Sequence, residues 1–209
     1  MKIILNGYKG KMGKIVYDYL CNKGYEIEGF DLEHPISKDV EFDIAIDFSS
    51  LSGAISLFNI CIEKKKPLVI GTTGFSPVII EEIKNKAVEA KIPVYLISNF
   101  SLSMCGVFSV LKRLSSLYEN VKIEETHHLS KKDFPSGTTL KLLSVCDPSL
   151  RKEIKIKRIS DFVFIHEITL SSKYEELVIK HKIKNKICYA IGVEQAIHHL
   201  DFVGVKEEL

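Results

Sequence analysis

Two adjacent histidines and a nearby lysine are the residues of this sequence best suited to acid–base chemistry. His127 and His128 follow an alternating, strand-like segment (121–124), and Lys131 comes three residues after His128. A Pro-Ser-Gly-Thr segment (135–138) then opens an apolar run with helical spacing. The N–H groups at a helix N-terminus lack intrahelical partners and attract anions. Imidazole, ammonium and N–H groups together predict a site that binds a carboxylate or phosphate and transfers a proton.

The alternative is a polar loop that carries its histidines on the surface, but this clustering favours a site. Neighbouring side chains of an extended strand face opposite sides. His127 and His128 therefore share one pocket only if the strand ends or bends there, and Leu129-Ser130 is where we expect that bend. Without it, His128 has a structural role.

A glycine-rich turn near the N-terminus predicts dinucleotide binding. Gly7, Gly10 and Gly13 follow the apolar strand 2–6 and open a run with helical spacing. Turns use glycine in many folds, but a glycine turn between the first strand and a helix is the context that dinucleotide-binding folds require. Asp31 lies 18 residues after Gly13, where an acidic residue accepts the ribose 2′-hydroxyl. The alternative role for Asp31 is that of a cap or turn residue.

The order of apolar segments predicts an α/β protein with two domains. Strands and helices alternate over residues 2–98, which indicates a Rossmann-like, doubly wound parallel sheet. The loops 71–74 and 98–101 end two of its strands, where ligands of open α/β sheets bind. Residues 99–186 are richer in strands and predict a second, α+β domain with a mixed open sheet for substrate binding and oligomerisation. A C-terminal helix, about 187–209, is expected to return to the first domain (1–98).

Composition indicates an ordinary globular protein. The 209 residues carry a formal net charge of +2, which gives no reason to expect nucleic acid as a partner. The five scattered cysteines lack the spacing of a metal site and are typical of a reducing, cytoplasmic environment. The N-terminus begins directly with an apolar strand, so we expect no signal peptide, and no apolar run is long enough to span a membrane.

Taken together, these segments resemble the 4-hydroxy-tetrahydrodipicolinate reductase family of lysine and diaminopimelate biosynthesis, over nearly the whole chain. The most specific element is the pattern Glu-x-x-His-His-x-x-Lys-x-Asp-x-Pro-Ser-Gly-Thr at 124–138. Gly-x-x-Gly-Lys-Met-Gly (7–13), Ile-Asp-Phe-Ser (46–49), Val-Ile-Gly-Thr-Thr-Gly-Phe (69–75) and Asn-Phe-Ser (99–101) support it in the same order.

The resemblance implies that a nicotinamide cofactor reduces a small, cyclic, unsaturated dicarboxylate. It implies neither nucleic acid nor a membrane as a partner. It implies that His127 donates the proton that completes the reduction and that Lys131 is the companion acid and charge partner. His128, Lys131 and the N–H groups of Gly137 and Thr138 would bind the carboxylates. Imidazole, with an unperturbed pKa of about 6.5, can supply a proton near neutral pH. The family also implies a cytoplasmic homotetramer built through the second-domain sheets.

The resemblance further implies cofactor contacts from four segments. The glycine turn would hold the dinucleotide, Asp31 the adenosine ribose, and two later loops the nicotinamide. The implied residues are Gly7, Gly10, Lys11, Met12, Gly13, Asp31, Gly71, Thr72, Thr73, Ser98, Asn99, Phe100 and Ser101. Lys9 and Lys11 would attract a 2′-phosphate whereas Asp31 would repel it, so we expect NADH, with NADPH as the alternative.

The chain departs from the family pattern at several places, and one is Phe164-Ile165, where many members have a longer loop and a glycine before the histidine matched by His166. Ser103-Met104 stands where the family commonly has a glycine after Asn-Phe-Ser. Ser50 and Leu51 replace an arginine that would stack on adenine, and Lys186 matches an arginine of the late substrate-domain strand.

Two other functions fit parts of the sequence. A different Rossmann-type enzyme, such as an aspartate or homoserine dehydrogenase, would share the first domain, but the 124–138 pattern suits dicarboxylate chemistry better. A nucleotide-binding protein without turnover would also keep the fold, and the altered Ser103 region is the feature that supports it. NADH that binds but is not oxidised in the presence of substrate would identify that case.

Overall fold

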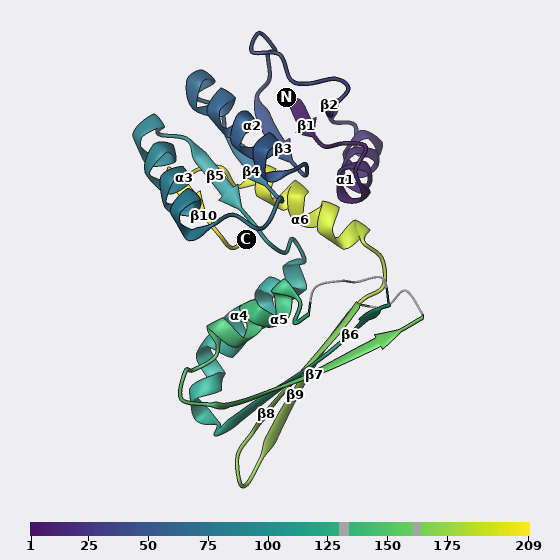
Figure 1. Cartoon of the computed structure of the whole chain (residues 1–209), viewed down its shortest axis with the longest axis vertical. Coiled ribbons are helices and arrows are strands. Elements are labelled where there is room, and N and C mark those ends of the chain that lie inside the picture. Colours follow the sequence, from purple (N-terminus) through teal and green to yellow (C-terminus); the bar gives the residue numbers. More distant parts are fainter. Residues whose placement is uncertain (130–133, 161–163) are drawn as a thin grey trace. The chain divides into compact units, whose positions relative to one another are not determined.

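The computed structural model describes residues 1–129, 134–160 and 164–209. They form two compact units, the first made of Met1–Ser101 with Ile187–Leu209 and the second of Leu102–Lys186 (Figure 1). Among the described residues, no helix is both long and apolar enough to cross a membrane.

The first unit is a parallel six-stranded sheet in the order β10-β5-β4-β3-β1-β2. Its strands are β1 (Lys2–Asn6), β2 (Glu26–Phe30), β3 (Ile44–Asp47), β4 (Leu68–Ile70), β5 (Pro93–Leu96) and β10 (Gly204–Lys206). The chain adds β2 on one side of β1 and β3 on the other. The strand order therefore reverses between β1 and β3, which is where open α/β sheets bind ligands.

Helices cover both faces of this sheet, as the predicted doubly wound fold requires. They are α1 (Lys11–Asn22), α2 (Leu51–Lys64), α3 (Pro77–Ala90) and α6 (Ile187–His198). Ile3 and Leu5 belong to a core that includes residues of α1 and α6, whereas Ile4 belongs to a core with α2 and α3. This alternation follows from the period of two along a strand. The Rossmann-like prediction is thus confirmed.

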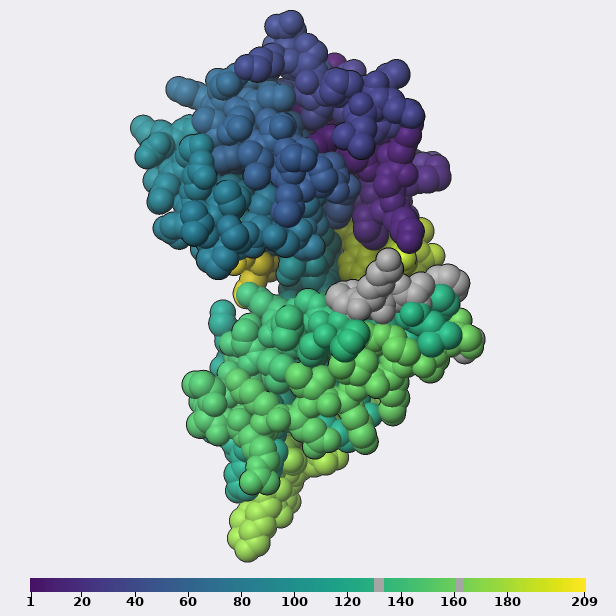
Figure 2. Space-filling view, viewed as in Figure 1, coloured from purple at the N-terminus to yellow at the C-terminus, as the bar shows by residue number. Residues whose placement is uncertain are grey.

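The C-terminal segment differs from the expected single helix. Helix α6 ends at His198, and the chain then forms β10, which pairs in parallel with β5. Gly204 adopts a φ of +92°, which glycine reaches without strain, and its N–H donates to the Ile92 carbonyl. The sequence did not predict β10, because three residues are too few to show the alternation of apolar and polar side chains that marks a strand. In Figure 2 the yellow C-terminal atoms lie against the purple and blue atoms of the same unit.

The second unit is a mixed four-stranded sheet in the order β7-β6-β8-β9, which confirms the predicted mixed sheet. Strand β6 (Asn120–His128) pairs in parallel with β7 (Arg151–Ile159) and antiparallel with β8 (Phe164–Ser171), which pairs with β9 (Glu176–Ile183). Helices α4 (Leu102–Leu114) and α5 (Gly137–Val145) lie along one face of this sheet, and the short helix η1 (Ser115–Leu117) follows α4 (Figure 1). Val121, Ile123 and Leu142 are wholly buried in the core between these helices and the sheet.

Candidate functional site

A pocket of about 650 Å³ opens at the C-terminal ends of β1, β2 and β3, at the point where the strand order reverses. Gly7, Gly10 and Asp31, three of the predicted cofactor residues, line it. Ile36, Leu57 and Ile60 give it an apolar wall, and its polar lining includes Asn6, Lys9, Ser49 and Ser50. An apolar wall with a few polar groups at a strand-order reversal is typical of a nucleotide site.

The glycine turn is packed too tightly to hold any larger residue. Gly7 has a φ of +80°, and a Cβ atom there would lie 2.4 Å from the Phe48 carbonyl oxygen. A Cβ atom on Gly13 would lie 2.0 Å from the Gly7 carbonyl oxygen. These contacts press the start of α1 onto β1, so that the N–H groups of the helix end face the turn.

Asp31 caps a turn, the alternative role that the sequence offered, and it also lines the pocket. One carboxylate oxygen accepts the N–H groups of Glu33 and His34, both at 2.9 Å, which fixes the turn after β2. The other oxygen lies 2.8 Å from Lys9 Nζ. Lys9 and the His34 and Glu33 N–H groups lower the pKa of Asp31. The side chain therefore presents an anion at the pocket wall, beside a lysine that also contacts Glu33 at 2.6 Å.

Asp47 is a buried carboxylate that the sequence did not single out as a site residue. It is fully buried at the end of β3 and accepts Asn6 Nδ2 at 2.9 Å, Ser49 Oγ at 2.5 Å and the hydroxyl of Thr72. Burial raises its pKa, and these hydrogen bonds act against that rise. Asp47 thereby connects the loops after β1, β3 and β4. Its place in Ile-Asp-Phe-Ser, directly after an apolar strand, was the available signal.

The remaining predicted cofactor residues lie on helix α1 and on two loops of the first unit. Thr72 Oγ1 accepts the Ser49 N–H at 3.1 Å, and a Cβ atom on Gly71 would lie 2.1 Å from the Phe48 ring. The Phe48 and Phe100 rings are 5.5 Å apart between centroids. Asn99 Oδ1 accepts the Ser101 N–H at 2.9 Å. Lys11, Thr73 and Ser98 are exposed, and Met12 is half-buried.

In the second unit, strand β6 presents a row of buried polar side chains to the helices. Alternate residues of β6 are buried, so Glu125 (0 % exposed) and His127 (3 %) follow Val121 and Ile123 on one face. His127 Nδ1 lies 3.6 Å from Glu125 Oε1. His166, on β8, is 6 % exposed and its ring centroid lies 5.1 Å from that of His127. The site prediction singled out His127 but neither Glu125 nor His166.

Glu125 also holds the start of helix α5. Its Oε2 accepts the Ser136 N–H at 2.9 Å and Thr139 Oγ1 at 2.7 Å, while Arg158 Nη2 donates to Oε1 at 3.0 Å. Desolvation alone would raise the pKa of Glu125, but the hydrogen bonds from Thr139, Ser136 and Arg158 outweigh it and lower the pKa to about 2. The carboxylate is therefore an anion at neutral pH despite its burial.

Strand β6 ends at His128, and Leu129 follows it in a turn, while Ser130 lies outside the described residues. Within the strand, His127 is buried and His128 is half-buried, as the alternation of side chains along a strand requires. Gly137 and Thr138 form the first two residues of α5, behind the N-cap Ser136, whose side chain accepts the Thr139 N–H at 3.2 Å. Gly137 is exposed and Thr138 half-buried, so this helix end is accessible. Lys131 lies outside the described residues.

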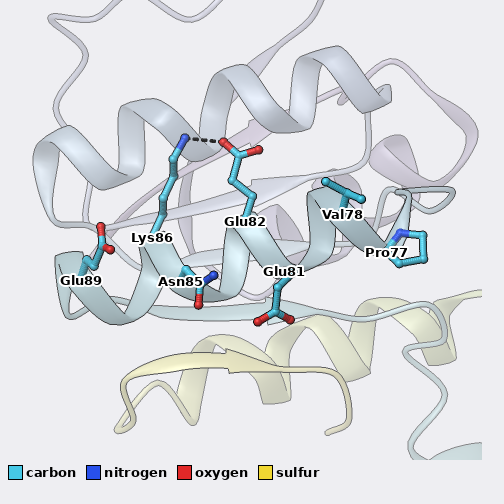
Figure 3. Close-up of a pocket in the computed structure, with 7 residues that line it drawn as sticks. All are labelled: Pro77, Val78, Glu81, Glu82, Asn85, Lys86 and Glu89. Atoms are coloured by element: carbon cyan, nitrogen blue, oxygen red, sulfur yellow. Dashed lines mark hydrogen bonds and ion pairs between the residues drawn. The ribbon is translucent and has the colours of Figure 1, made fainter.

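The exposed side of α3 carries a shallow hollow lined by Pro77, Val78, Glu81, Glu82, Asn85, Lys86 and Glu89 (Figure 3). Its one ion pair joins Glu82 to Lys86 along the helix, a pairing that stabilises an exposed face. Among the described residues no group of three His, Cys, Asp or Glu side chains could hold a metal ion.

Comparisons with known proteins assign both units to one family. The family model described as dihydrodipicolinate reductase, N-terminus, matches residues 22–100, and the model described as dihydrodipicolinate reductase, C-terminus, matches residues 103–207. The 4-hydroxy-tetrahydrodipicolinate reductase of Wigglesworthia glossinidia brevipalpis is 30 % identical over 230 residues, covering 94 % of this chain and 86 % of that protein. A protein of the same name from Clostridium perfringens strain SM101 is 30 % identical, with 96 % and 92 % covered.

A solved structure of similar fold covers the whole chain. Dipicolinate-bound dihydrodipicolinate reductase from Paenisporosarcina sp. TG-14 matches with a TM-score of 0.84 and 18 % identity, covering 100 % of this chain and 98 % of that one.

Proposed function

The chain belongs to the dihydrodipicolinate reductase family, and on that premise we propose that it reduces 4-hydroxy-tetrahydrodipicolinate to tetrahydrodipicolinate with a pyridine nucleotide. The observation that carries the proposal is that the two family models together match residues 22–207 except for a short gap, including both units. The reaction belongs to lysine and diaminopimelate biosynthesis. The same resemblance leads us to propose a cytoplasmic location and a homotetramer. Light scattering of the purified protein measures the oligomeric state.

The first unit fits a pyridine dinucleotide. Its pocket has room for a nucleotide moiety, its glycines allow close approach of a diphosphate, and Asp31 offers an anionic acceptor for ribose hydroxyls. When bound, the reduced cofactor supplies the hydride. We propose contacts from Gly7, Gly10, Lys11, Met12, Gly13, Asp31, Gly71, Thr72, Thr73, Ser98, Asn99, Phe100 and Ser101. Asp31 would repel a 2′-phosphate, so we propose NADH as the preferred cofactor.

The second unit supplies the groups that a dicarboxylate and a proton transfer need. Loss of the 4-hydroxyl of the substrate as water gives a conjugated imine. Hydride addition to this imine leaves negative charge that a proton must neutralise, and we propose His127 as its donor. The exposed N-terminus of α5, at Gly137 and Thr138, is suited to hold a carboxylate. We propose Lys131 as the companion acid and His128 and Lys131 as further carboxylate ligands.

The decisive experiment follows the absorbance of NADH and of NADPH with freshly prepared 4-hydroxy-tetrahydrodipicolinate. We expect oxidation that depends on the dicarboxylate. Parallel assays with aspartate and homoserine test the other dehydrogenase chemistries. NADH binding without oxidation in any assay would contradict the proposal and identify a nucleotide-binding protein without turnover.

A further inference from the structure

Glu125 connects three separate parts of the second unit through one buried carboxylate. It contacts His127 on its own strand, the first turn of α5 through Ser136 and Thr139, and Arg158 on β7. A buried carboxylate without partners would be costly to ionise, whereas this one has three hydrogen-bond donors. The contact set therefore ties the orientation of the His127 ring to the position of the α5 N-terminus.

The position of the carboxylate relative to the His127 ring has a chemical consequence. A group that accepts from one ring nitrogen of histidine selects the tautomer with the proton on that nitrogen. Glu125 Oε1 lies 3.6 Å from Nδ1, which is longer than a hydrogen bond. A small movement of either side chain would form the bond, and catalytic hydrogen bonds often shorten in this way when substrate binds. A proton held at Nδ1 leaves Nε2 as the nitrogen that gains and donates the catalytic proton.

Other charged or titratable side chains lie around His127. Among the described residues packed around it, Arg158 comes from β7, opposite His127 in the strand register. His166 comes from β8, and Lys186 lies over the ring of Phe164, which contacts His127 edge-on. His181 on β9 is the register partner of His166. Arg158, His166 and Lys186 carry or can carry positive charge. Among these described neighbours of His127, Glu125 is the residue that carries negative charge.

We propose that Glu125 is a positioning residue of the reductase, which orients His127 through Nδ1 for proton donation and holds the α5 N-terminus in place for the substrate carboxylate. The inference rests on the proposed function for its catalytic part. The orientation of the ring is a property of the protein alone and is testable without turnover.

The test compares Glu125→Gln with Glu124→Gln. Glu124 is the adjacent residue on the opposite face, where it pairs with Lys122 and Lys157 at 3.0 Å, so its variant is a matched control. For Glu125→Gln we expect kcat to fall at least about tenfold, the KM of the dicarboxylate to rise, and the KM of NADH to stay unchanged. Loss of the anion should also move the His127-dependent limb of the pH profile to lower pH by roughly one unit.

A merely structural role would reduce the amount of active protein without moving the pH profile. Glu125→Asp, which keeps the charge, should retain the wild-type limb. An unchanged pH profile in Glu125→Gln, or an equal shift in Glu124→Gln, would overturn the proposal.

A second measurement observes the His127 ring in the wild-type protein and needs no turnover. Nitrogen NMR of histidine-labelled protein, with His127 assigned from a His127→Gln sample, should show the neutral ring protonated at Nδ1. A ring protonated at Nε2 would contradict the proposal even if the reductase activity is present. Conversely, absent activity with an Nδ1-protonated ring would refute the proposed function and leave the orientation by Glu125 standing.

Discussion

Gly13 and Gly7 approach so closely that a Cβ atom on Gly13 would lie 2.0 Å from the Gly7 carbonyl oxygen. Contacts of this length between Cβ and backbone oxygen do not occur without a shift of the backbone. The turn that we propose holds the dinucleotide therefore depends on the absence of a side chain at residue 13.

Gly13→Ala should therefore open the turn and weaken NADH binding, with a loss of roughly 1–3 kcal/mol in the free energy of unfolding. Fluorescence titration with NADH and urea denaturation measure the two effects. Gly106→Ala is the matched control, because a Cβ atom there meets nothing within 4 Å and residue 106 lies inside helix α4. It should stabilise the protein by about 0.5–1 kcal/mol. Tight NADH binding by Gly13→Ala would contradict the assignment of this turn.

Asp31→Ala should weaken NADH more than NADPH. The carboxylate offers the acceptor for ribose hydroxyls, and its removal also frees Lys9 to meet a 2′-phosphate. Loss of a hydrogen bond to a charged group should raise the KM of NADH by about tenfold to a hundredfold. Initial rates with both cofactors measure the ratio, with Glu33→Gln as the control for the second Lys9 partner. A larger loss with NADPH would refute the ribose assignment.

His127→Gln should lower turnover far more than it lowers substrate affinity. Removal of a general acid costs about 10²–10⁴-fold in rate, and glutamine keeps a polar side chain in the buried row. Steady-state kinetics with varied dicarboxylate separate kcat from KM. The comparison is His128→Gln, on the other face of β6, which should raise KM if His128 holds a carboxylate. Wild-type turnover in His127→Gln would exclude His127 as the proton donor.

Lys131→Ala should both slow turnover and raise the KM of the dicarboxylate, because an ammonium group serves as acid and as charge partner. The expectation comes from the resemblance of the 124–138 pattern, since Lys131 lies outside the described residues. Binding of dipicolinate, measured by calorimetry, separates affinity from chemistry. Affinity that is indifferent to the change would mean that another group holds the carboxylates.

Acid should destabilise the second unit partly through Glu125. Its pKa in the folded protein is about 2, below the value of 4.5 for an unperturbed glutamate. The carboxylate therefore stabilises the fold above about pH 4.5, and this contribution disappears as the pH falls toward 2, with an upper limit of about 3 kcal/mol. Urea denaturation of Glu125→Gln between these pH values should show a flatter decline than wild type. An identical decline would show that Glu125 does not ionise in this way.

The sequence alone predicted the alternation of strands and helices in the first unit, its doubly wound parallel sheet, and the loops at strand ends as the places where a ligand would bind. These features depend on local patterns: alternation along β6, glycines after β1, an acidic residue after β2. The resemblance carried by residues 124–138 rested on one continuous segment. His127 could be singled out for the same reason, because the residues that mark it as a site residue are its neighbours in the continuous 124–138 pattern.

Only the tertiary structure decided which groups surround those residues. Glu125 meets Ser136 and Thr139 because α5 packs on β6, and it meets Arg158 because β7 pairs beside that strand. Asp47 likewise connects segments that are more than twenty positions apart in the sequence, since Asn6 precedes it by 41 positions and Thr72 follows it by 25. Such contacts depend on how elements pair and pack, and no local period encodes which polar side chain will find which buried partner. The same holds for β10, whose three residues form a strand only because the edge of β5 is there to accept them.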